Sequence, residues 1–277
     1  MTFRRHESAT TSNTDAAAPS GGHMALAGFA LLASWLALAP AKAATPNLPA
    51  LYRDHAVSLV FVRATYRHGE TTTTKSSTGL VLSGGRILTK CESVRRGDND
   101  ELDVDSIEVV IGRRDRKSGM VKPDRTVPVK LIRCDRERDL AILATHFPLP
   151  KPLRLASADP TPGQLGAAMG HSWRGLPWTI HRCNVAGVGR PNRDFTKLLS
   201  AATATTTQAR QKDLDRTTML EVDCDTHPTY GSPVVAANGR VLGVLQVAHF
   251  DPKHDAPNKY YLYLAASEIR AFLDESK

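Results

Sequence analysis

Short runs of alternating apolar and polar residues recur along most of the chain, and this period of two is typical of half-buried β-strands. In the first half these runs occupy residues 57–64, 80–89, 107–111, 127–132 and 140–144, and the second of them turns at Gly84 and Gly85. In the second half they occupy residues 165–169, 179–188, 219–223, 233–236, 240–248 and 260–264. The pattern predicts a mostly β protein.

The runs fall into two groups that are separated by a proline-bounded crossing at residues 148–152. We therefore expect one β domain over residues 45–150 and a second over residues 151–277. Ile269, Phe272 and Leu273 have the i, i+3, i+4 spacing of one buried stripe, which predicts a short closing helix. An insertion at residues 191–218 has a low-complexity Ala/Thr core, which favours a mobile surface loop of unknown role.

The N-terminal region carries no strand pattern and predicts export. Residues 24–39 are apolar except for Gly28 and Ser34, a run that is short for a membrane span. Ala41 and Ala43 provide small residues at the −3 and −1 positions of a cut after Ala43, so residues 1–44 are interpreted as a polar leader plus signal peptide. A retained membrane anchor is the alternative, and either Met1 or Met24 could be the start. We expect a periplasmic or secreted protein.

The chain has a net charge of +8, and its part after residue 44 holds 33 basic against 26 acidic side chains. Such a surface favours anionic partners, including lipopolysaccharide or the acidic groups of peptidoglycan. No basic helix with interleaved aromatic residues occurs, so the sequence predicts no specific nucleic-acid site. The oligomeric state does not follow from the sequence.

The four cysteines, Cys91, Cys134, Cys183 and Cys224, all lie after the predicted cleavage site. An even number of cysteines in an oxidising compartment favours two disulfides, with three possible connectivities. Free buried thiols are the alternative. A zinc site is disfavoured because the cluster at residues 224–227 lacks a second ligand pair at a suitable spacing. Nothing in the sequence calls for a metal or a cofactor.

Four segments in order carry a resemblance to a known family. Residues 77–89 form a strand, a glycine turn and a strand that ends in Leu-Thr, and residues 135–143 place Asp139 before Leu-Ala-Ile-Leu. Residues 162–170 with 179–190 follow, and residues 225–244 contain a Gly-Ser-Pro-Val run and a hairpin. This order resembles the trypsin-like serine proteases, in particular their HtrA/Deg-like branch. It implies an all-β fold of two antiparallel six-stranded β-barrels with a short C-terminal helix.

The resemblance places Glu92 where the family has its catalytic histidine and Tyr230 where it has its serine, while Asp139 retains the aspartate. Pro228 falls where the family supplies an oxyanion N–H, and proline has none to donate. A carboxylate is a weak base for a hydroxyl at neutral pH, and a phenol fills the space of a scissile carbonyl. We therefore expect a catalytically degenerate protease homologue, a pseudoprotease, with no working catalytic residue.

The resemblance has further implications for pairing and binding. It favours disulfides Cys91–Cys134 and Cys183–Cys224, one within each barrel. Residues 244–248 resemble the strand that pairs with extended substrate, so Val244, Gln246 and Val247 are candidate peptide-binding residues. Because the sequence stops after the closing helix, we expect no appended peptide-binding (PDZ) domain.

Three function classes remain open. The first is a pseudoprotease that binds a peptide or protein partner, and the second is an active serine-type endopeptidase with rearranged residues. Ser232 is the nearest alternative nucleophile for that enzyme, with His227 or His249 as base, although a supporting role in its turn is favoured for Ser232. The third class is a structural or assembly component of the cell envelope.

The fold hypothesis also predicts contacts at the degenerate site. Glu92 and Asp139 should lie close together, and two nearby carboxylates need a donor or a cation between them. A phenol can supply such a donor, so we expect the hydroxyl of Tyr230 to turn toward Glu92.

Overall fold

The computed structural model describes residues 45–95, 103–172, 176–191, 216–225, 229–249 and 260–275. The predicted leader lies outside these ranges, and so do residues 192–215 of the predicted loop. Residues 43–277 form one compact unit. Among the described helices, none is long and apolar enough to cross a membrane.

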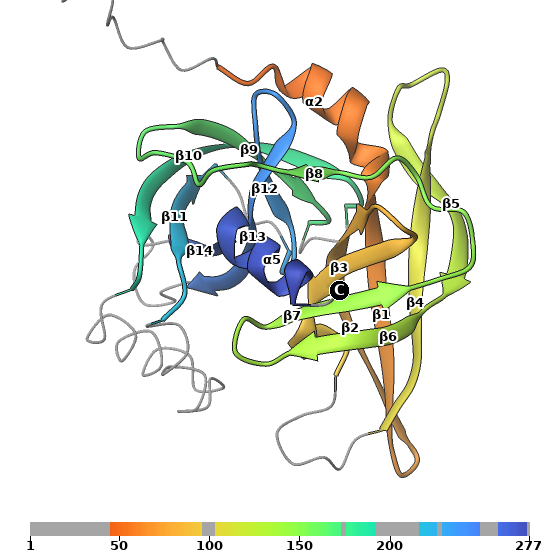
Figure 1. The fold of residues 1–277 in the computed structure, drawn as a ribbon. Coiled ribbons are helices and arrows are strands. Elements are labelled where there is room, and N and C mark those ends of the chain that lie inside the picture. The colour runs from red at the N-terminus through yellow and green to blue at the C-terminus, as the bar shows by residue number, and fades with distance from the viewer. Residues whose placement is uncertain are drawn as a thin grey trace, which may run out of the picture. The chain divides into compact units, whose positions relative to one another are not determined.

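The first half of the described chain forms a seven-stranded antiparallel sheet (Figure 1). Its strands occur in the order β5-β4-β1-β2-β3-β7-β6. Their bounds are β1 Leu59–His68, β2 Thr71–Leu82, β3 Arg86–Lys90, β4 Asp103–Arg114, β5 Val121–Pro128, β6 Lys130–Asp135 and β7 Leu140–Ala144. Gly84 and Gly85 have φ of 75° and 69°, a conformation that favours glycine, and they make the tight turn from β2 to β3.

The second half forms a closed barrel. Six strands run in the order β12-β9-β10-β11-β14-β13, and β13 pairs again with β12. The bounds are β9 Leu165–Gly170, β10 Thr179–Gly189, β11 Met219–Cys224, β12 Pro233–Ala236, β13 Arg240–His249 and β14 Tyr260–Ala265. A two-residue strand, β8 Arg154–Leu155, adds in parallel to β13.

Two helices flank these sheets: α2 Leu48–His55 and α5 Ala266–Asp274. The closing helix α5 follows the predicted stripe, since Ile269 and Phe272 are fully buried. Helix α2 was not predicted, because its eight residues bury only Leu51 and therefore show no long apolar period. Asn47 caps it by accepting a hydrogen bond from the Ala50 N–H at 3.1 Å.

The predicted fold class is confirmed, with the sequence runs and the observed strands differing in detail. The first sheet has seven strands where six were expected. The run predicted over residues 127–132 is divided between β5 and β6 at Val129. The backbone N–H of Val129 donates to the carbonyl of Ile107 in β4 at 3.0 Å, so the contact with β4 extends one residue beyond β5 before β6 begins.

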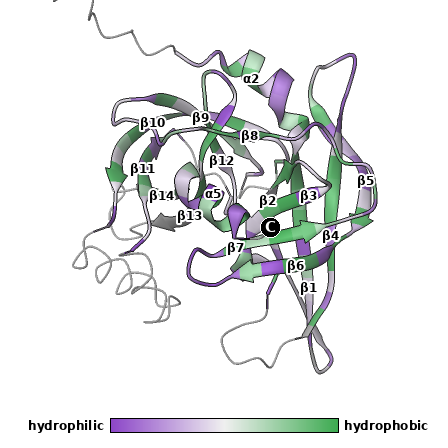
Figure 2. Cartoon of the chain, viewed as in Figure 1, coloured by the Kyte–Doolittle hydropathy of each residue, from purple (hydrophilic) through white to green (hydrophobic). Residues whose placement is uncertain are grey.

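The interior explains the period-two pattern. Val60, Val62 and Ala64 of β1 are completely buried, while Phe61 and Arg63 point to the opposite face of the strand. Figure 2 shows the hydrophobic positions concentrated on the strands, with hydrophilic residues at the turns. One face of β1 therefore builds the core, and the other face is available to line a site.

Both predicted disulfides are confirmed. Cys91 pairs with Cys134 at a Cα–Cα distance of 5.4 Å, and Cys183 pairs with Cys224 at 4.2 Å. The second bridge joins directly opposed residues of β10 and β11. Two disulfides are typical of proteins outside the cytoplasm.

Candidate functional site: an ion cluster and the adjoining cleft

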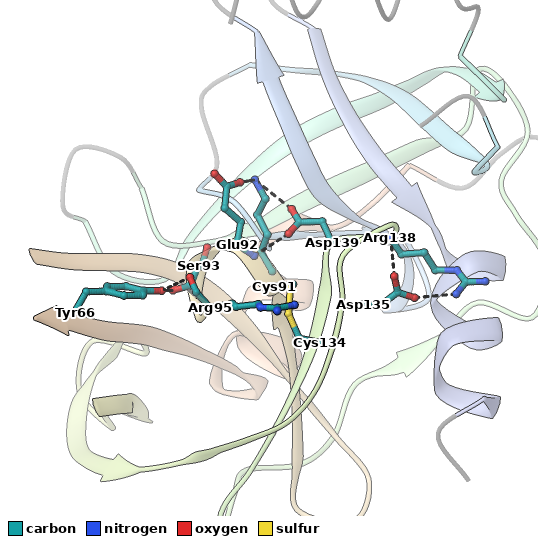
Figure 3. The surroundings of a disulfide bond; sticks show 10 residues. Tyr66, Cys91, Glu92, Ser93, Arg95, Cys134, Asp135, Arg138 and Asp139 are labelled. Carbon is teal, nitrogen blue, oxygen red and sulfur yellow. Dashed lines mark hydrogen bonds and ion pairs between the residues drawn. A yellow bond between two sulfur atoms is a disulfide. The ribbon is translucent and has the colours of Figure 1, made fainter. Parts of the chain in front are cut away.

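Three charged side chains gather at the end of β3. The Nζ of Lys90 lies 2.9 Å from a carboxylate oxygen of Glu92 and 3.4 Å from Oδ2 of Asp139. The side chains of Lys90 and Asp139 are 5% and 10% exposed, whereas that of Glu92 is 49% exposed. Figure 3 shows Glu92 and Asp139 on the same side of the Cys91–Cys134 bridge. Glu92 and Asp139, which the resemblance aligns with the family's histidine and aspartate, thus lie together as predicted.

The backbone of Asp139 is shaped to hold this arrangement. Its φ of 51° lies in the left-handed region, which costs a non-glycine residue about 1 kcal/mol or more. The conformation is stabilised by two hydrogen bonds: the Cys91 N–H donates to the carbonyl of Asp139 at 3.1 Å, and the Glu92 N–H donates to its Oδ1 at 2.8 Å. The carboxylate therefore contacts the backbone of Glu92 and the ammonium of Lys90.

Tyr230 covers the same ammonium from the second half of the chain. The Nζ of Lys90 lies 4.0 Å from the centroid of the Tyr230 ring, which is within the range of a cation–π contact. We call Lys90, Glu92, Asp139 and Tyr230 the ion cluster. The cation between the two carboxylates is Lys90, which was not predicted. A contact of the Tyr230 hydroxyl with Glu92 stays a prediction.

Lys90 was not predicted as a site residue, because the resemblance concerns only the triad positions. A signal was present in the sequence: Lys90 directly precedes Cys91, the cysteine whose predicted bridge brings this segment near Asp139. Lys90 was therefore a candidate counter-ion.

The turn that carries Tyr230 is fixed to the first sheet. The Thr78 N–H donates to the carbonyl of Tyr230 at 2.9 Å, and the Gly231 N–H donates to the carbonyl of Leu245 at 3.0 Å. Gly231 has a φ of 77°, and a Cβ there would lie 2.3 Å from the Thr78 carbonyl oxygen. Only glycine fits this close approach, so the tyrosine is held by backbone contacts on both sides.

Thr78 is also the centre of a buried polar network. Its Oγ1 accepts hydrogen bonds from the His171 N–H and the Ser232 hydroxyl, both at 3.2 Å. It also lies 2.9 Å from Oγ1 of Thr229 and 3.1 Å from Nδ1 of His171. Ser232, the alternative nucleophile considered from the sequence, is completely buried in this network.

The ring of His171 is neutral and carries its proton on Nε2. Burial lowers the pKa of His171 to about 3. The two accepted bonds occupy both lone pairs of Thr78 Oγ1, so Nδ1 of His171 can only accept a hydrogen bond from that hydroxyl. The proton of the neutral ring is therefore assigned to Nε2. Nε2 is buried and has no hydrogen-bond partner among the described residues.

A cleft of about 750 Å³ adjoins the ion cluster and His171. Strands β1, β2, β4 and β5 of the first sheet line it, together with the segments that hold His171, Trp178 and Tyr230. The His171 ring centroid lies 4.8 Å from that of Phe61 and 5.0 Å from that of Trp178. We call Phe61, His171 and Trp178 the aromatic wall.

The candidate peptide-binding residues lie on β13. Val244 and Gln246 of β13 are buried, and neither polar atom of the Gln246 amide has a partner among the described residues. The pairing of β13 with β12 ends at Val244, while the pairing with β14 continues to His249, also through Val247. The two residues predicted from the second barrel's loop, Pro228 and His227, lie outside the described residues.

Across the described ranges no group of three or more metal-ligating side chains could hold a metal ion.

Comparison with known proteins decides the family. A model of the trypsin-like peptidase domain matches residues 77–244, which is more than half of the chain. The chain belongs to the trypsin-like peptidase domain family. No curated protein matches it. The placing of the family's active-site positions on the ion cluster and the assignment to the HtrA/Deg-like branch both stay predictions.

Solved structures resemble the fold of this trypsin-like domain. The active form of the Rv3671c protease from M. tuberculosis has a TM-score of 0.57 at 20% identity, over 82% of this chain and 86% of that chain. The inactive form of the same protease has a TM-score of 0.56 at 19% identity, over 84% and 97% of the two chains. At such identity the likeness concerns the fold alone.

Proposed function

We propose that this protein is an exported, catalytically inert member of the trypsin-like family that binds a peptide or protein partner in the cell envelope. The observation that carries the proposal is the ion cluster. A buried lysine ammonium is paired with two carboxylates and covered by a tyrosine ring. Three of these residues, Glu92, Asp139 and Tyr230, are those that the resemblance aligns with the family's catalytic triad.

Inertness follows from the chemistry of these groups. Serine hydrolysis needs a hydroxyl nucleophile, a base that takes its proton, and N–H donors for the oxyanion. The carboxylate of Asp139 accepts a hydrogen bond from the Glu92 N–H and forms an ion pair with Lys90. The residue that the resemblance aligns with the catalytic histidine is Glu92, which has no imidazole. Tyr230 presents a phenol ring over Lys90 in place of a small hydroxyl.

The rival enzyme with Ser232 as nucleophile is disfavoured by geometry. Its hydroxyl is completely buried and donates to Thr78. His171 is linked to the same threonine, but a pKa of about 3 makes its imidazole a poor base at neutral pH. A substrate carbonyl would have to enter the packed network to reach Ser232.

Peptide binding does not require the catalytic residues. A cleft of about 750 Å³ is of the size that binding sites in proteins usually have. Beyond Val244, strand β13 remains paired with β14 along one edge. Its pairing with β12 along the other edge ends at Val244. An extended peptide could add to that strand through its backbone. The leader and the disulfides support the envelope as the compartment.

Binding of unfolded casein, followed by fluorescence anisotropy, tests the proposal. The protein should bind labelled casein, and gels of the same mixture should show no more cleavage than with a Tyr230→Ala variant. Leu176 of the cleft and Ile132 of β6 are 63% and 62% exposed, so they provide a matched pair. Leu176→Asp should weaken binding, whereas Ile132→Asp should not. Cleavage by the unchanged protein, or equal effects of the two variants, would contradict the proposal.

A further inference from the structure

The cleft beside the ion cluster has a strongly apolar part. Phe61, Val110, Leu176, Pro177 and Trp178 line it. Leu176 is 63% exposed, which is unusual for a large hydrophobic side chain in this protein. Such a concave apolar surface fits one bulky apolar side chain of a ligand.

Cations lie next to this apolar part. Arg63, Lys75 and Lys90 line the cleft, and Glu92 is the acidic residue among the lining side chains. Lys90 is engaged by Glu92 and Asp139, so Arg63 and Lys75 set the charge of the remaining surface. Arg63 also pairs with Glu108 at 3.1 Å, and the half-exposed Glu108 is outside the cleft lining. The cleft is therefore complementary to a negatively charged ligand.

Two buried donors at the cleft have no acceptor among the described residues. They are Nε2 of His171, which is protonated by the argument above, and Nε of Arg63. A buried polar group without a partner costs about 1 to 3 kcal/mol. Because both residues line the cleft and both atoms donate, the group that would satisfy them is an oxygen acceptor.

The spacing of these features is set by β1. Phe61 and Arg63 are two residues apart on the same face of the strand, which corresponds to about 7 Å. In an extended peptide, side chains two positions apart also share one face at about this separation. The apolar part and the cationic part of the cleft can thus be filled by two such side chains of one ligand.

We propose that the cleft recognises an extended acidic peptide in which a bulky apolar residue and a carboxylate-bearing residue stand two positions apart. The apolar side chain packs on the aromatic wall, the carboxylate lies at Arg63 and Lys75, and His171 Nε2 donates to an oxygen of the peptide. This deepens, and rests on, the proposed function as a peptide-binding member of the family.

The wall is built in advance for such a ligand. Trp178 has a φ of 51°, a strained conformation for an aromatic residue, and is only 2% exposed. Its Nε1–H donates to the carbonyl of Leu59 at 2.9 Å. A Cβ on Gly112 would lie 2.5 Å from the Trp178 ring, so the glycine leaves the space that the indole fills. A preformed surface loses little entropy when it binds.

Three capped peptides test the proposal by anisotropy with the purified protein. The first has the core Asp-Ser-Phe-Ser-Asp, the second replaces both aspartates by asparagine, and the third has the same composition in the order Ser-Asp-Phe-Asp-Ser. The first should bind at least tenfold more tightly than the asparagine peptide and clearly more tightly than its isomer. Added salt should weaken the first peptide most.

Variants locate the effect. Arg63→Gln and Lys75→Gln should each reduce the preference for aspartate over asparagine several-fold, whereas Lys130→Gln, an exposed residue of β6 outside the cleft lining, should leave it unchanged. Far-ultraviolet circular dichroism and melting curves identify any variant that fails to fold, and the two cleft variants serve as independent tests.

The outcomes separate this inference from the proposed function. Equal binding of the aspartate and asparagine peptides overturns the inference while leaving peptide binding intact, and so does equal binding of the two isomers. If none of the peptides binds but casein does, the inference is wrong and the proposed function stands. Displacement of the first peptide by laurate at lower concentration than by its own unlabelled form would assign the cleft to a lipid carboxylate.

Discussion

The ion cluster and the aromatic wall lie at the same cleft and satisfy their polar groups in opposite ways. In the ion cluster, Lys90 contacts two carboxylates and a ring, and Asp139 accepts from the Glu92 N–H. In the aromatic wall, the Nε2–H of His171 is buried without a partner among the described residues. Contacts within the protein stabilise the first region, whereas the second keeps an unused donor.

This difference indicates which of the two regions can bind a ligand. Groups that are fully bonded within the protein have little left to offer a ligand, because each new contact must replace an existing one. A rigid wall with an unused donor can gain a hydrogen bond at once. We therefore propose that the ion cluster serves as a structural contact, and we expect recognition at the aromatic wall.

The largest expected effect on stability comes from removing the disulfides, one of which adjoins the ion cluster. Removing Cys91–Cys134 or Cys183–Cys224 by paired serine substitutions should each lower the free energy of unfolding by about 4 kcal/mol, because the closed loops span 43 and 41 residues. Cys91 adjoins Glu92, so its loss should also loosen the ion cluster. Denaturant unfolding of both variants checks this. Removal of the first bridge should cost more, and an equal or smaller cost would show that the cluster is independent of it.

Lys90→Met should lower the free energy of unfolding by about 3 kcal/mol, because it leaves the buried carboxylate of Asp139 without its cation. Lys130→Met, at an exposed position, should change it by less than about 0.5 kcal/mol. Urea titrations of both proteins supply the measurement. A second substitution, Asp139→Asn, should recover part of the loss in the Lys90→Met background. Unchanged stability of Lys90→Met would show that the cluster does not stabilise the fold.

The aromatic wall should respond to pH. The folded pKa of His171 is about 3, below its ordinary value of 6.5, so the folded state favours the neutral ring. Its contribution to stability is therefore present above about pH 6.5 and is lost as the pH falls toward 3. By pH 4.5 the loss should be about 2 kcal/mol.

His171→Phe provides the control, since phenylalanine keeps a ring between Phe61 and Trp178 but does not titrate. Unfolding at pH 7 and pH 4.5 should show a smaller decline for this variant than for the unchanged protein. Parallel declines would mean that His171 is not buried in its neutral form.

Gly112→Ala should disturb the wall without touching the ion cluster. The added methyl would lie 2.4 Å from Val121 and 2.5 Å from Trp178, so the indole must move. We expect a loss of about 1 to 2 kcal/mol and a shifted tryptophan emission maximum. Gly119→Ala is a comparison at a glycine with open space, although its φ of 70° adds backbone strain. An unshifted emission maximum in Gly112→Ala would show that the added methyl group does not change the surroundings of Trp178.

Much of this arrangement could be predicted from the sequence, because period-two alternation and glycine turns are local signals. They located β10 and β12 to within about one residue, and the family resemblance gave both disulfide pairings. The i, i+3, i+4 stripe predicted the closing helix α5 without its bounds. The resemblance also identified Glu92, Asp139 and Tyr230, which the structure brings together around one cation.

The rest depends on contacts between distant segments. Lys90 and His171 were not selected as site residues. The place of Lys90 before Cys91 was a local signal, but the position of its ammonium between two carboxylates and the missing acceptor at the His171 ring edge depend on distant segments. Helix α2 was missed because it has a single buried residue. Burial and hydrogen-bond satisfaction are properties of the assembled fold, and local patterns do not carry them.

Labelling with a serine-reactive fluorophosphonate tests the central claim most directly. If the ion cluster replaces the family's catalytic residues, as proposed, the purified protein should show no covalent labelling above that of a Tyr230→Ala variant, at any pH from 6 to 9. Intact mass spectrometry would detect a single adduct. Labelling that disappears in Ser232→Ala would contradict the account, because it would show that a buried serine of the Thr78 network acts as a nucleophile.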